Sequence, residues 1–376
     1  MKYLLTLFLS SLYFAVLAEV KPVKILAKID NAKSDSVSIG YFPLADRLSE
    51  KMDTVLLKNG VLEYQLEVKE PHEMMIIPFE LIHHFKNGRI YPLPGSKVRF
   101  IINNGDGIQI NAKIEDKSIS YTLTGNKISE QLTQSRLDKI EVFKSAYQFH
   151  VRYNEKKKTE NTPDDEKTFS ANVASNNLAY QNANLKYVKQ HLNDEVSPLL
   201  LLEVRNRDTV VKLYQLFSTE AKESYHGKIL GTLIKGWYTT KLGQKLPPLV
   251  SKTINGKPFV LGETNGKYLL LDFWGSWCTP CIAEMPELKK FQQKYQNKVE
   301  LIGLVCRDTK EKALTAIKKH ALNWTHLYSE TEEFGTLFGV TAYPTKILLD
   351  PNGVVVKIYA GVNETMMDEI ATIINK

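Results

Sequence analysis

The sequence "FWGSWCTPCIAEMP", residues 273–286, places Cys278 and Cys281 three positions apart, directly after an apolar run. That run, "KYLLLDFW" (267–274), has the composition of a buried strand, and residues 279–296 have the pattern of a helix. The cysteine pair therefore stands where a strand ends and a helix begins. Such a pair serves as a redox couple, as half of a metal site or as a local disulfide staple.

The metal site lacks the residues that it needs, and the staple would contribute little stability. A zinc site takes four ligands, but the chain has no second cysteine pair, and His320 and His326 are isolated. Covalent haem attachment requires a histidine after the second cysteine, where Ile282 stands. A staple that closes so short a loop removes little entropy from the unfolded chain. We therefore expect a redox couple, with no metal and no other cofactor.

The start of a helix suits this chemistry. Free N–H groups and the positive end of the helix dipole favour a thiolate at Cys278. Cys281, one turn further on, is expected to be covered and within reach of the first sulfur. This arrangement suits attack by Cys278 on a partner's disulfide, followed by resolution of the mixed disulfide by Cys281.

Two acidic residues accompany the pair. Asp272 ends an apolar strand, where an unpaired carboxylate is costly. It is either a turn or capping residue or, as the strand context favours, a buried carboxylate. Burial disfavours the charged form, so Asp272 could accept a proton from Cys281. Glu284, one turn beyond Cys281, is equally consistent with a functional carboxylate and with an acid that complements the helix dipole.

The N-terminus has the features of an export signal. A basic start is followed by the short apolar stretch "YLLTLFLSSLYFAVLA", which ends in small residues. We interpret residues 1–18 as a secretory signal peptide cut after Ala18. An uncleaved membrane anchor is the alternative, but a spanning helix needs about 20 apolar residues. The mature protein is then expected to be exported, periplasmic and without a stable membrane span.

Composition narrows the partners. The chain has 376 residues, 43% of them hydrophobic and 24% charged, which predicts two or three globular domains. Its formal net charge of +7 is spread along the sequence, which argues against nucleic-acid binding. Three cysteines are too few for a disulfide scaffold, so stability must come from packing and the cysteines are candidates for chemistry.

Periodicity divides the mature chain into three parts. Residues 19–125 alternate polar and apolar in short segments and predict an antiparallel β domain, sandwich-like in form. Residues 126–242 carry apolar side chains at helical spacing and predict a helical region, in which Asp164 or Asp165 could cap the second long helix. Residues 243–376, after a Gly/Pro-containing linker (241–251), alternate strand and helix, which predicts a central sheet with helices on both faces.

Residues 243–376 resemble a thioredoxin-fold domain of the TlpA-like or ResA-like thiol-disulfide oxidoreductases. The matching motifs are "DFWGSWCTPC", with aspartate six before the first cysteine; Pro286, five after the second; "AYPT" (342–345), the family's cis-proline loop; and "GVN" (361–363). They cover about a third of the chain. The upstream part resembles, in architecture, the β-rich and helical extension of exported Bacteroidetes-type proteins.

The resemblance implies a role for each site residue. Cys278 would be the surface nucleophile, Cys281 the resolving thiol, and Asp272 the buried proton acceptor. Glu284 matches a glutamate that lines the active-site cavity in the ResA-like branch, which favours its functional interpretation. The cis-proline position falls on Pro344, and the substrate-binding positions fall on Trp274, Trp277, Tyr343 and Thr345.

The sequence thus predicts an exported protein-disulfide oxidoreductase, a reductase by its resemblance. Its expected partners are disulfide-containing protein substrates and a membrane thiol electron donor. A thiol peroxidase is a second possibility, but Leu271 and Gly275 stand where peroxiredoxins have proline and threonine. A binding or chaperone-like protein with an accessory redox domain is a third. The remaining Cys306 ends an apolar strand, where core packing is the expected role and a regulatory disulfide the alternative.

Overall fold

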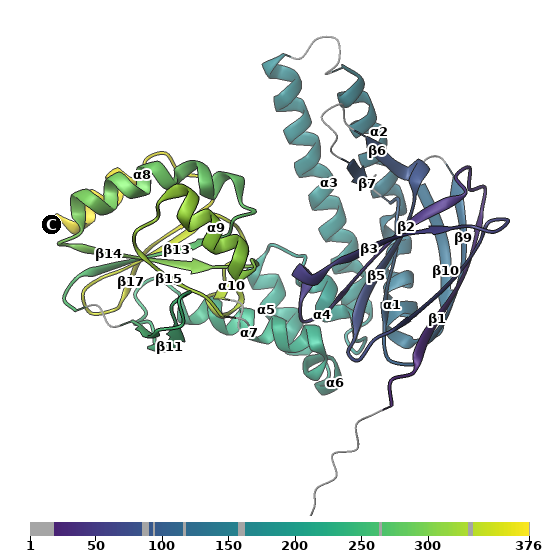
Figure 1. Ribbon diagram of the computed structural model, residues 1–376, viewed down its shortest axis with the longest axis horizontal. Coiled ribbons are helices and arrows are strands. Elements are labelled where there is room, and N and C mark those ends of the chain that lie inside the picture. Colours follow the sequence, from purple (N-terminus) through teal and green to yellow (C-terminus); the bar gives the residue numbers. More distant parts are fainter. Residues whose placement is uncertain are drawn as a thin grey trace, which may run out of the picture. The chain divides into compact units, whose positions relative to one another are not determined.

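The computed structural model describes residues 19–84, 90–92, 95–115, 118–156, 162–262, 265–329 and 334–375. The signal peptide predicted at 1–18 lies outside the described residues. The described residues fall into two compact units, one on each side of the boundary between Gln134 and Ser135 (Figure 1). Among the described residues, no helix combines the length and the apolar character that a membrane span requires.

Two four-stranded sheets make up the first unit, with strand orders β10-β9-β1-β4 and β3-β2-β5-β8. Neighbouring strands are antiparallel, as predicted, except that β1 runs parallel to β9. The strands are β1 (Pro22–Asp30), β2 (Ser36–Pro43), β3 (Lys51–Leu56), β4 (Val61–Glu67), β5 (His72–Pro78), β8 (Val98–Ile102), β9 (Gly107–Glu115) and β10 (Ser118–Thr124); a separate pair is formed by β6 (Ile82–His84) and β7 (Ile90–Pro92).

The alternation seen in the sequence builds one core between these sheets. Ile25 and Ile110 from the first sheet join Ile39, Met74 and Phe100 from the second in a single buried apolar cluster. Every second residue of β9 from Ile108 to Ala112 is buried, because successive side chains of a strand point to opposite faces.

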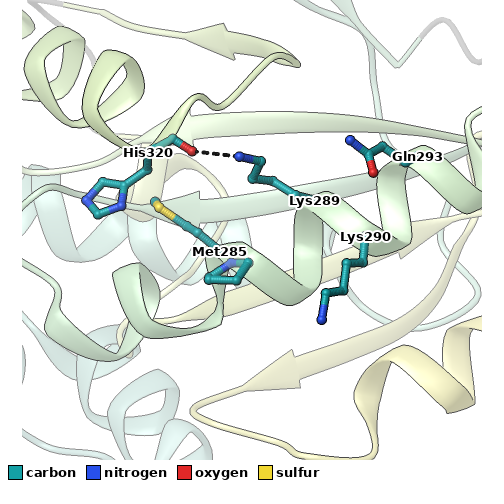
Figure 2. Close-up of a pocket in the computed structure, with 6 residues that line it drawn as sticks. Met285, Lys289, Lys290, Gln293 and His320 are labelled. Atoms are coloured by element: carbon teal, nitrogen blue, oxygen red, sulfur yellow. Dashed lines mark hydrogen bonds between the residues drawn. The ribbon is translucent and has the colours of Figure 1, made fainter.

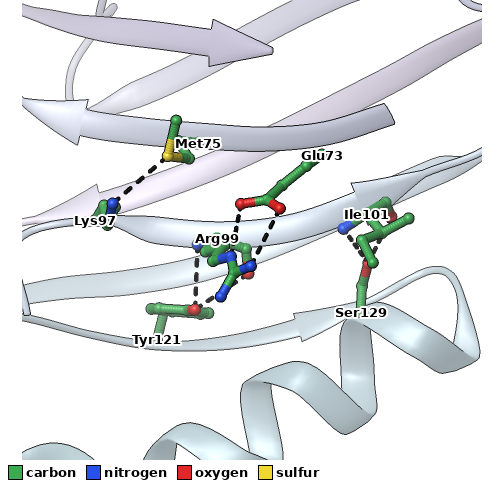
Figure 3. Close-up of polar contacts among 7 residues, drawn as sticks. All are labelled: Glu73, Met75, Lys97, Arg99, Ile101, Tyr121 and Ser129. Carbon is green, nitrogen blue, oxygen red and sulfur yellow. Dashed lines mark hydrogen bonds and ion pairs between the residues drawn. The ribbon is translucent and has the colours of Figure 1, made fainter. Parts of the chain in front are cut away.

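A buried ion pair lies on the other face of the second sheet (Figure 3). Glu73 on β5 is 3% exposed and accepts from Arg99 on β8, with Nε–Oε1 at 2.6 Å and Nη2–Oε2 at 3.1 Å. Tyr121 Oη accepts from the backbone N–H of Arg99. Nearby, Ser129 of helix α1 (Lys127–Arg136) exchanges two hydrogen bonds with the backbone of Ile101, which fixes the start of that helix on the sheet.

Helices follow, as the spacing predicted. They are η3 (Leu137–Lys139), α2 (Ile140–Lys156), α3 (Pro163–Gln190), α4 (Val196–Leu201), α5 (Arg207–Leu216), α6 (Thr219–Glu223) and α7 (Tyr225–Thr239). The cap of α3 is Thr162, so the predicted cap at Asp164 or Asp165 is wrong. Pro163 takes the first helical position, where no N–H is needed, and Asp165 completes a reciprocal capping box with Thr162.

The helical region joins the C-terminal sheet domain through a close contact of two backbones. Gly236 of α7 approaches Gly339, which follows α10 (Phe334–Leu337); a Cβ built on Gly236 would lie 2.4 Å from the Gly339 nitrogen. Trp237 Nε1 donates to the Gly339 carbonyl at 2.9 Å. The segment predicted as a linker is also held, since Gly243 and Leu246 donate backbone hydrogen bonds to the hairpin that begins β17.

A five-stranded sheet of order β15-β14-β13-β16-β17 organises the C-terminal part. The two neighbours of β13 differ: β14 is parallel to it and β16 antiparallel. The elements are β11 (Leu249–Lys252), β12 (Pro258–Leu261), β13 (Tyr268–Trp274), α8 (Thr279–Tyr295), β14 (Val299–Val305), α9 (Lys310–His320), β15 (Thr325–Leu327), β16 (Thr345–Leu349), β17 (Val355–Ala360) and α11 (Met366–Ile374).

Helices cover both faces of this sheet, which confirms the predicted fold class. Leu270 and Leu348 pack on Leu288 of α8 and Ile370 of α11 on one face. On the other face, Leu271, Phe273 and Ile347 pack on Phe334 and Phe338. The sequence did not predict β15, α10 or the β11–β12 hairpin, which are short elements of three or four residues.

Candidate active site

The two cysteines lie at the start of α8, where the apolar strand β13 ends. They form a disulfide with a Cα–Cα distance of 5.2 Å. Cys278 is the N-cap of the helix, and its sulfur accepts from the backbone N–H of Cys281 at 3.3 Å. The first sulfur therefore sits where a helix offers an unpaired N–H and its positive dipole end, and both favour a thiolate after reduction.

Both cysteines are buried in this disulfide form. Cys278 is 3% exposed and Cys281 is 1% exposed, so the structure corrects the expectation that Cys278 lies at the surface. The pair belongs to an apolar cluster with Trp274, Met285 and Ile254, against which Tyr343 packs. These side chains cover the sulfur that the sequence alone left open to solvent.

The loop before Cys278 is tied to the loop that follows β14. Trp277 Nε1 donates to the Cys306 carbonyl at 3.1 Å, and the Ser276 N–H donates to Asp308 Oδ2 at 2.5 Å. Gly275 is required here, because a Cβ would lie 2.7 Å from the Cys306 carbonyl oxygen. These contacts fix the approach of the chain to Cys278.

The cis-proline loop stands beside this pair. The Tyr343–Pro344 peptide bond is cis, and the Tyr343 ring meets the half-exposed Trp277 edge-on at 5.3 Å. Arg307 lies over the same Tyr343 ring at 5.4 Å. Thr345 is buried and donates to the Ala342 carbonyl at 2.8 Å, so it shapes the loop from inside.

A buried lysine joins the two predicted carboxylates. Asp272 on β13 and Lys346 on β16 are cross-strand partners, each 1% exposed, with Oδ1 and Nζ 3.2 Å apart. Glu284, from the first turns of α8, forms a second ion pair with the same Nζ. Burial lowers the pKa of Lys346, and the adjacent Asp272 carboxylate opposes that shift.

Trp274 and Cys306 occupy the interior. Trp274 is fully buried and donates through Nε1 to His326 Nδ1 at 3.2 Å, and burial lowers the pKa of His326 to about 4. Trp274 thus supports the site from within instead of flanking an open groove. Cys306 is a buried cysteine outside the disulfide, and its sulfur donates to the Leu304 carbonyl at 3.4 Å.

A pocket adjoins the site on the outside of α8 (Figure 2). Its volume is about 260 Å³, and it is lined by Met285, Pro286, Lys289, Lys290, Gln293 and His320. Lys289 Nζ donates to the His320 carbonyl at the end of α9. Met285 also packs in the cluster around the cysteines, so this side chain belongs both to the pocket wall and to the disulfide cluster.

The structure brings the predicted site residues together at one end of β13, α8 and β16. It adds Lys346, Asp308, Arg307 and His326, which sequence reasoning missed. Lys346 carried a signal, because a lysine inside the apolar strand "TKILLD" needs a partner as much as Asp272 does. In the described part of the chain, no three His, Cys, Asp or Glu side chains gather closely enough to hold a metal ion.

The fold and this site define a thioredoxin-like thiol-disulfide protein, and comparisons agree. The Redoxin family model matches residues 241–374. Thiol-disulfide oxidoreductase ResA of Bacillus thuringiensis subsp. konkukian is 31% identical over 140 residues, which are 36% of this chain and 81% of that protein. Thioredoxin-like protein YneN of Bacillus subtilis is 31% identical over 121 residues, 32% of this chain and 71% of that protein.

Among solved structures, the thioredoxin domain of a thiol-disulfide oxidoreductase from Bacteroides vulgatus is 22% identical. It matches 36% of this chain and 99% of its own, with a TM-score of 0.33. The ResA match decides the family because four fifths of that protein are covered. The chain belongs to the ResA/TlpA-like thiol-disulfide oxidoreductases, through its C-terminal domain.

Proposed function

We propose that this protein is an exported thiol-disulfide oxidoreductase that reduces disulfides in other proteins through Cys278 and Cys281. The observation that carries the proposal is the Cys278–Cys281 disulfide at the start of α8, packed against the Tyr343 side of the cis-proline loop. In the family, this loop lies against the substrate segment. Trp277, half-exposed and in contact with Tyr343, offers that segment an apolar surface.

The reaction exchanges one disulfide for another. In the reduced protein, the Cys278 thiolate attacks one sulfur of the substrate disulfide, forms a mixed disulfide and releases the other sulfur as a thiolate. Cys281 gives its proton to the Asp272–Glu284 pair and attacks the Cys278 sulfur. The Cys278–Cys281 disulfide forms and the second substrate thiolate leaves. Two electrons pass to the substrate, and a membrane thiol donor returns two electrons to the protein.

Opening of the site is part of this proposal, because both sulfurs are buried in the disulfide form. Tyr343 is partly buried against the cluster around the pair, and Trp277, which contacts the Tyr343 ring, is 48% exposed. A substrate would displace these rings to reach Cys278. The cationic Arg307 beside Tyr343 would then lie at the edge of the bound segment.

The reduction potential tests the direction of electron flow. The mature chain, residues 19–376, is equilibrated with defined thiol–disulfide buffers while tryptophan fluorescence is followed. A value near that of thioredoxin, about −270 mV, supports a reductase, and a value near about −120 mV overturns that direction in favour of an oxidant. A variant with both Cys278→Ser and Cys281→Ser is the control and should show no redox-linked change in fluorescence.

Export is tested separately by expressing the full sequence and a version that begins at residue 19. The proposal expects the full sequence to yield a shortened chain in the periplasmic fraction, beginning at Glu19. Retention of the full-length chain in the cytoplasm or the membrane would refute this part of the proposal.

A further inference from the structure

In the described part of the chain, Lys346 is the one basic side chain that pairs with the carboxylates Asp272 and Glu284. It lies in the middle of the sheet, 1% exposed, and its Nζ reaches Asp272 on one side and Glu284 on the other. An ammonium costs free energy when it is buried, so its position calls for an explanation. One ammonium would balance the charge of one buried carboxylate, but here a single ammonium pairs with two carboxylates.

The two carboxylates reach the lysine from two different elements. Asp272 comes from the neighbouring strand β13, two residues before Trp274 and on the same face of the strand. Glu284 comes from α8, three residues after Cys281 and therefore on the same side of that helix. Trp274 and Cys281 pack in one cluster. The three charged groups thus lie on the face of the sheet that carries the resolving cysteine.

Other titratable groups face Lys346 less directly. Tyr359 is its cross-strand partner on β17, and its hydroxyl group is 3.4 Å from Glu369 of α11. Burial raises the pKa of Tyr359 to about 12, so this phenol stays neutral near neutral pH. Glu369 also pairs with Lys357, whose side chain is 43% exposed. Among the described residues, the charged groups paired with Lys346 are therefore two carboxylates, and the cysteine pair lies on the same face of the sheet.

We propose that Lys346 is a positioning residue for the proton transfer from Cys281, holding Asp272 and Glu284 in their charged forms so that they can accept it. This inference rests on the proposed function and adds a residue to it. A nearby opposite charge favours an ionised carboxylate, whereas two carboxylates at one site without a cation share a proton. Without the ammonium, the two carboxylates would repel each other, and the pair would lose the charge that compensates them.

The attack by Cys281 can be measured apart from the attack by Cys278. Reduced protein is mixed with the aromatic disulfide 5,5′-dithiobis(2-nitrobenzoate) in a stopped-flow instrument. Cys278 attacks the reagent, forms a mixed disulfide and releases one coloured thiolate. Cys281 then attacks the Cys278 sulfur, closes the protein disulfide and releases the second. The first phase reports Cys278, and the pH midpoint of the second phase reports the deprotonation of Cys281.

Lys346→Met removes the charge with little change in volume. We expect the first phase to keep its rate, and the midpoint of the second phase to rise by about one to three pH units. The second phase should accordingly slow by about tenfold for each unit at pH values below both midpoints. Lys357→Met, on the neighbouring strand, is the matched control and should leave both phases as in the wild type. An unchanged midpoint in Lys346→Met overturns the proposal, as does an equal slowing of both phases.

A second comparison covers the case in which Lys346→Met does not fold, since it leaves two uncompensated carboxylates. Glu284→Gln is compared with the double variant Glu284→Gln/Lys346→Met, in which Asp272 is the remaining carboxylate of the pair. A higher midpoint in the double variant supports the proposal, and equal midpoints overturn it. Failure of the proposed redox role of Cys278 and Cys281 looks different, because the reduced wild type would then release no second equivalent of thiolate. A reversed direction of electron flow would appear in the reduction potential and would leave both phases in place.

Discussion

The indole N–H of Trp274 donates to Nδ1 of His326 at 3.2 Å, inside the C-terminal domain, where His326 is 3% exposed. The bond requires an unprotonated Nδ1, so it exists only while the imidazole is neutral. Burial lowers the pKa of His326 to about 4, which keeps the ring neutral at physiological pH. The same Trp274 packs against both cysteines, so the histidine supports the wall of the candidate site.

His326 should make the stability of the protein depend on pH. Because the folded-state pKa lies below the ordinary value of about 6.5, the unfolded chain binds the proton first as the pH falls. The free energy of unfolding should therefore fall between about pH 6.5 and pH 4, and His326 should account for about 2 to 3 kcal/mol of the loss at pH 4.5. Urea unfolding of the wild type and of His326→Gln at pH 7 and pH 4.5 measures this contribution.

The difference between the two pH values should be smaller in His326→Gln by that amount. His320→Gln, which changes a histidine at the end of α9, is the control and should keep the wild-type difference. An equal pH dependence in His326→Gln and the wild type would contradict the assignment.

Gly236 should be intolerant of any side chain. A methyl group there would lie 2.4 Å from the Gly339 nitrogen and 2.7 Å from the Leu337 carbonyl oxygen. Alanine in a helix gains about 1 kcal/mol over glycine, but backbone atoms cannot move aside as a flexible side chain can. Overpacking costs about 1 to 3 kcal/mol, so we expect Gly236→Ala to lower the melting temperature and to expose residues 240–248 to proteases.

Gly107→Ala is the matched control, since nothing lies within 4 Å of the Cβ position there. It should leave the melting temperature and the cleavage pattern unchanged. A Gly236→Ala protein as stable as the wild type would show that α7 is not held against α10 by this contact.

The sequence predicted the fold of the C-terminal domain because its signals are local. A buried strand, a helix and a cysteine pair stand side by side in residues 267–296, and β13 and α8 form there. What it missed depends on contacts between distant residues. Lys346 meets Glu284 across 62 positions, and the cover over Cys278 includes Ile254 and Tyr343. No spacing rule links these positions, so burial of the nucleophile and the lysine bridge became visible only in the structure.

The parallel pair of β1 and β9 was missed for a related reason. Alternation of polar and apolar residues indicates where each strand lies in the sequence, but it does not identify the strand that pairs with it. Short connections predict antiparallel hairpins, whereas β1 and β9 are separated by more than 70 residues. Thr162 could have been recognised as the cap of α3, because it precedes Pro163 and stands three residues before Asp165.

Removal of Arg99 alone from the buried Glu73–Arg99 pair should destabilise the protein more than replacement of both residues. Arg99→Met leaves the Glu73 carboxylate, 3% exposed, without its bidentate partner, and such losses cost about 3 to 5 kcal/mol. Replacement of both by apolar residues, as in Glu73→Leu/Arg99→Met, should restore most of that stability, because no buried charge remains. Chemical unfolding of the three proteins gives the comparison. A double variant as unstable as the single one would mean that the pair matters through other contacts.

Asp308 should control the loop that leads into Cys278. Its carboxylate accepts from the N–H of Ser276 at 2.5 Å and from the N–H of Thr309 at 2.9 Å, and the residue is 7% exposed. Hydrogen bonds to a charged acceptor contribute about 1.5 to 3 kcal/mol, and an orphaned buried donor adds to the loss. We therefore expect Asp308→Ala to lower the free energy of unfolding by about 2 to 3 kcal/mol, with a smaller loss in Asp308→Asn, which retains one acceptor oxygen.

The hydrogen bond from Ser276 to Asp308 also restrains the backbone two residues before Cys278. Without it, the neighbouring Trp277 should sample more conformations, and its fluorescence lifetimes should become more widely distributed. The lifetimes are measured with and without Asp308→Ala in a background where Trp237, Trp274 and Trp324 are phenylalanine. If the lifetimes stay as narrow as in that background alone, while stability falls, then the carboxylate anchors the start of α9 through Thr309 and does not order the loop before the disulfide.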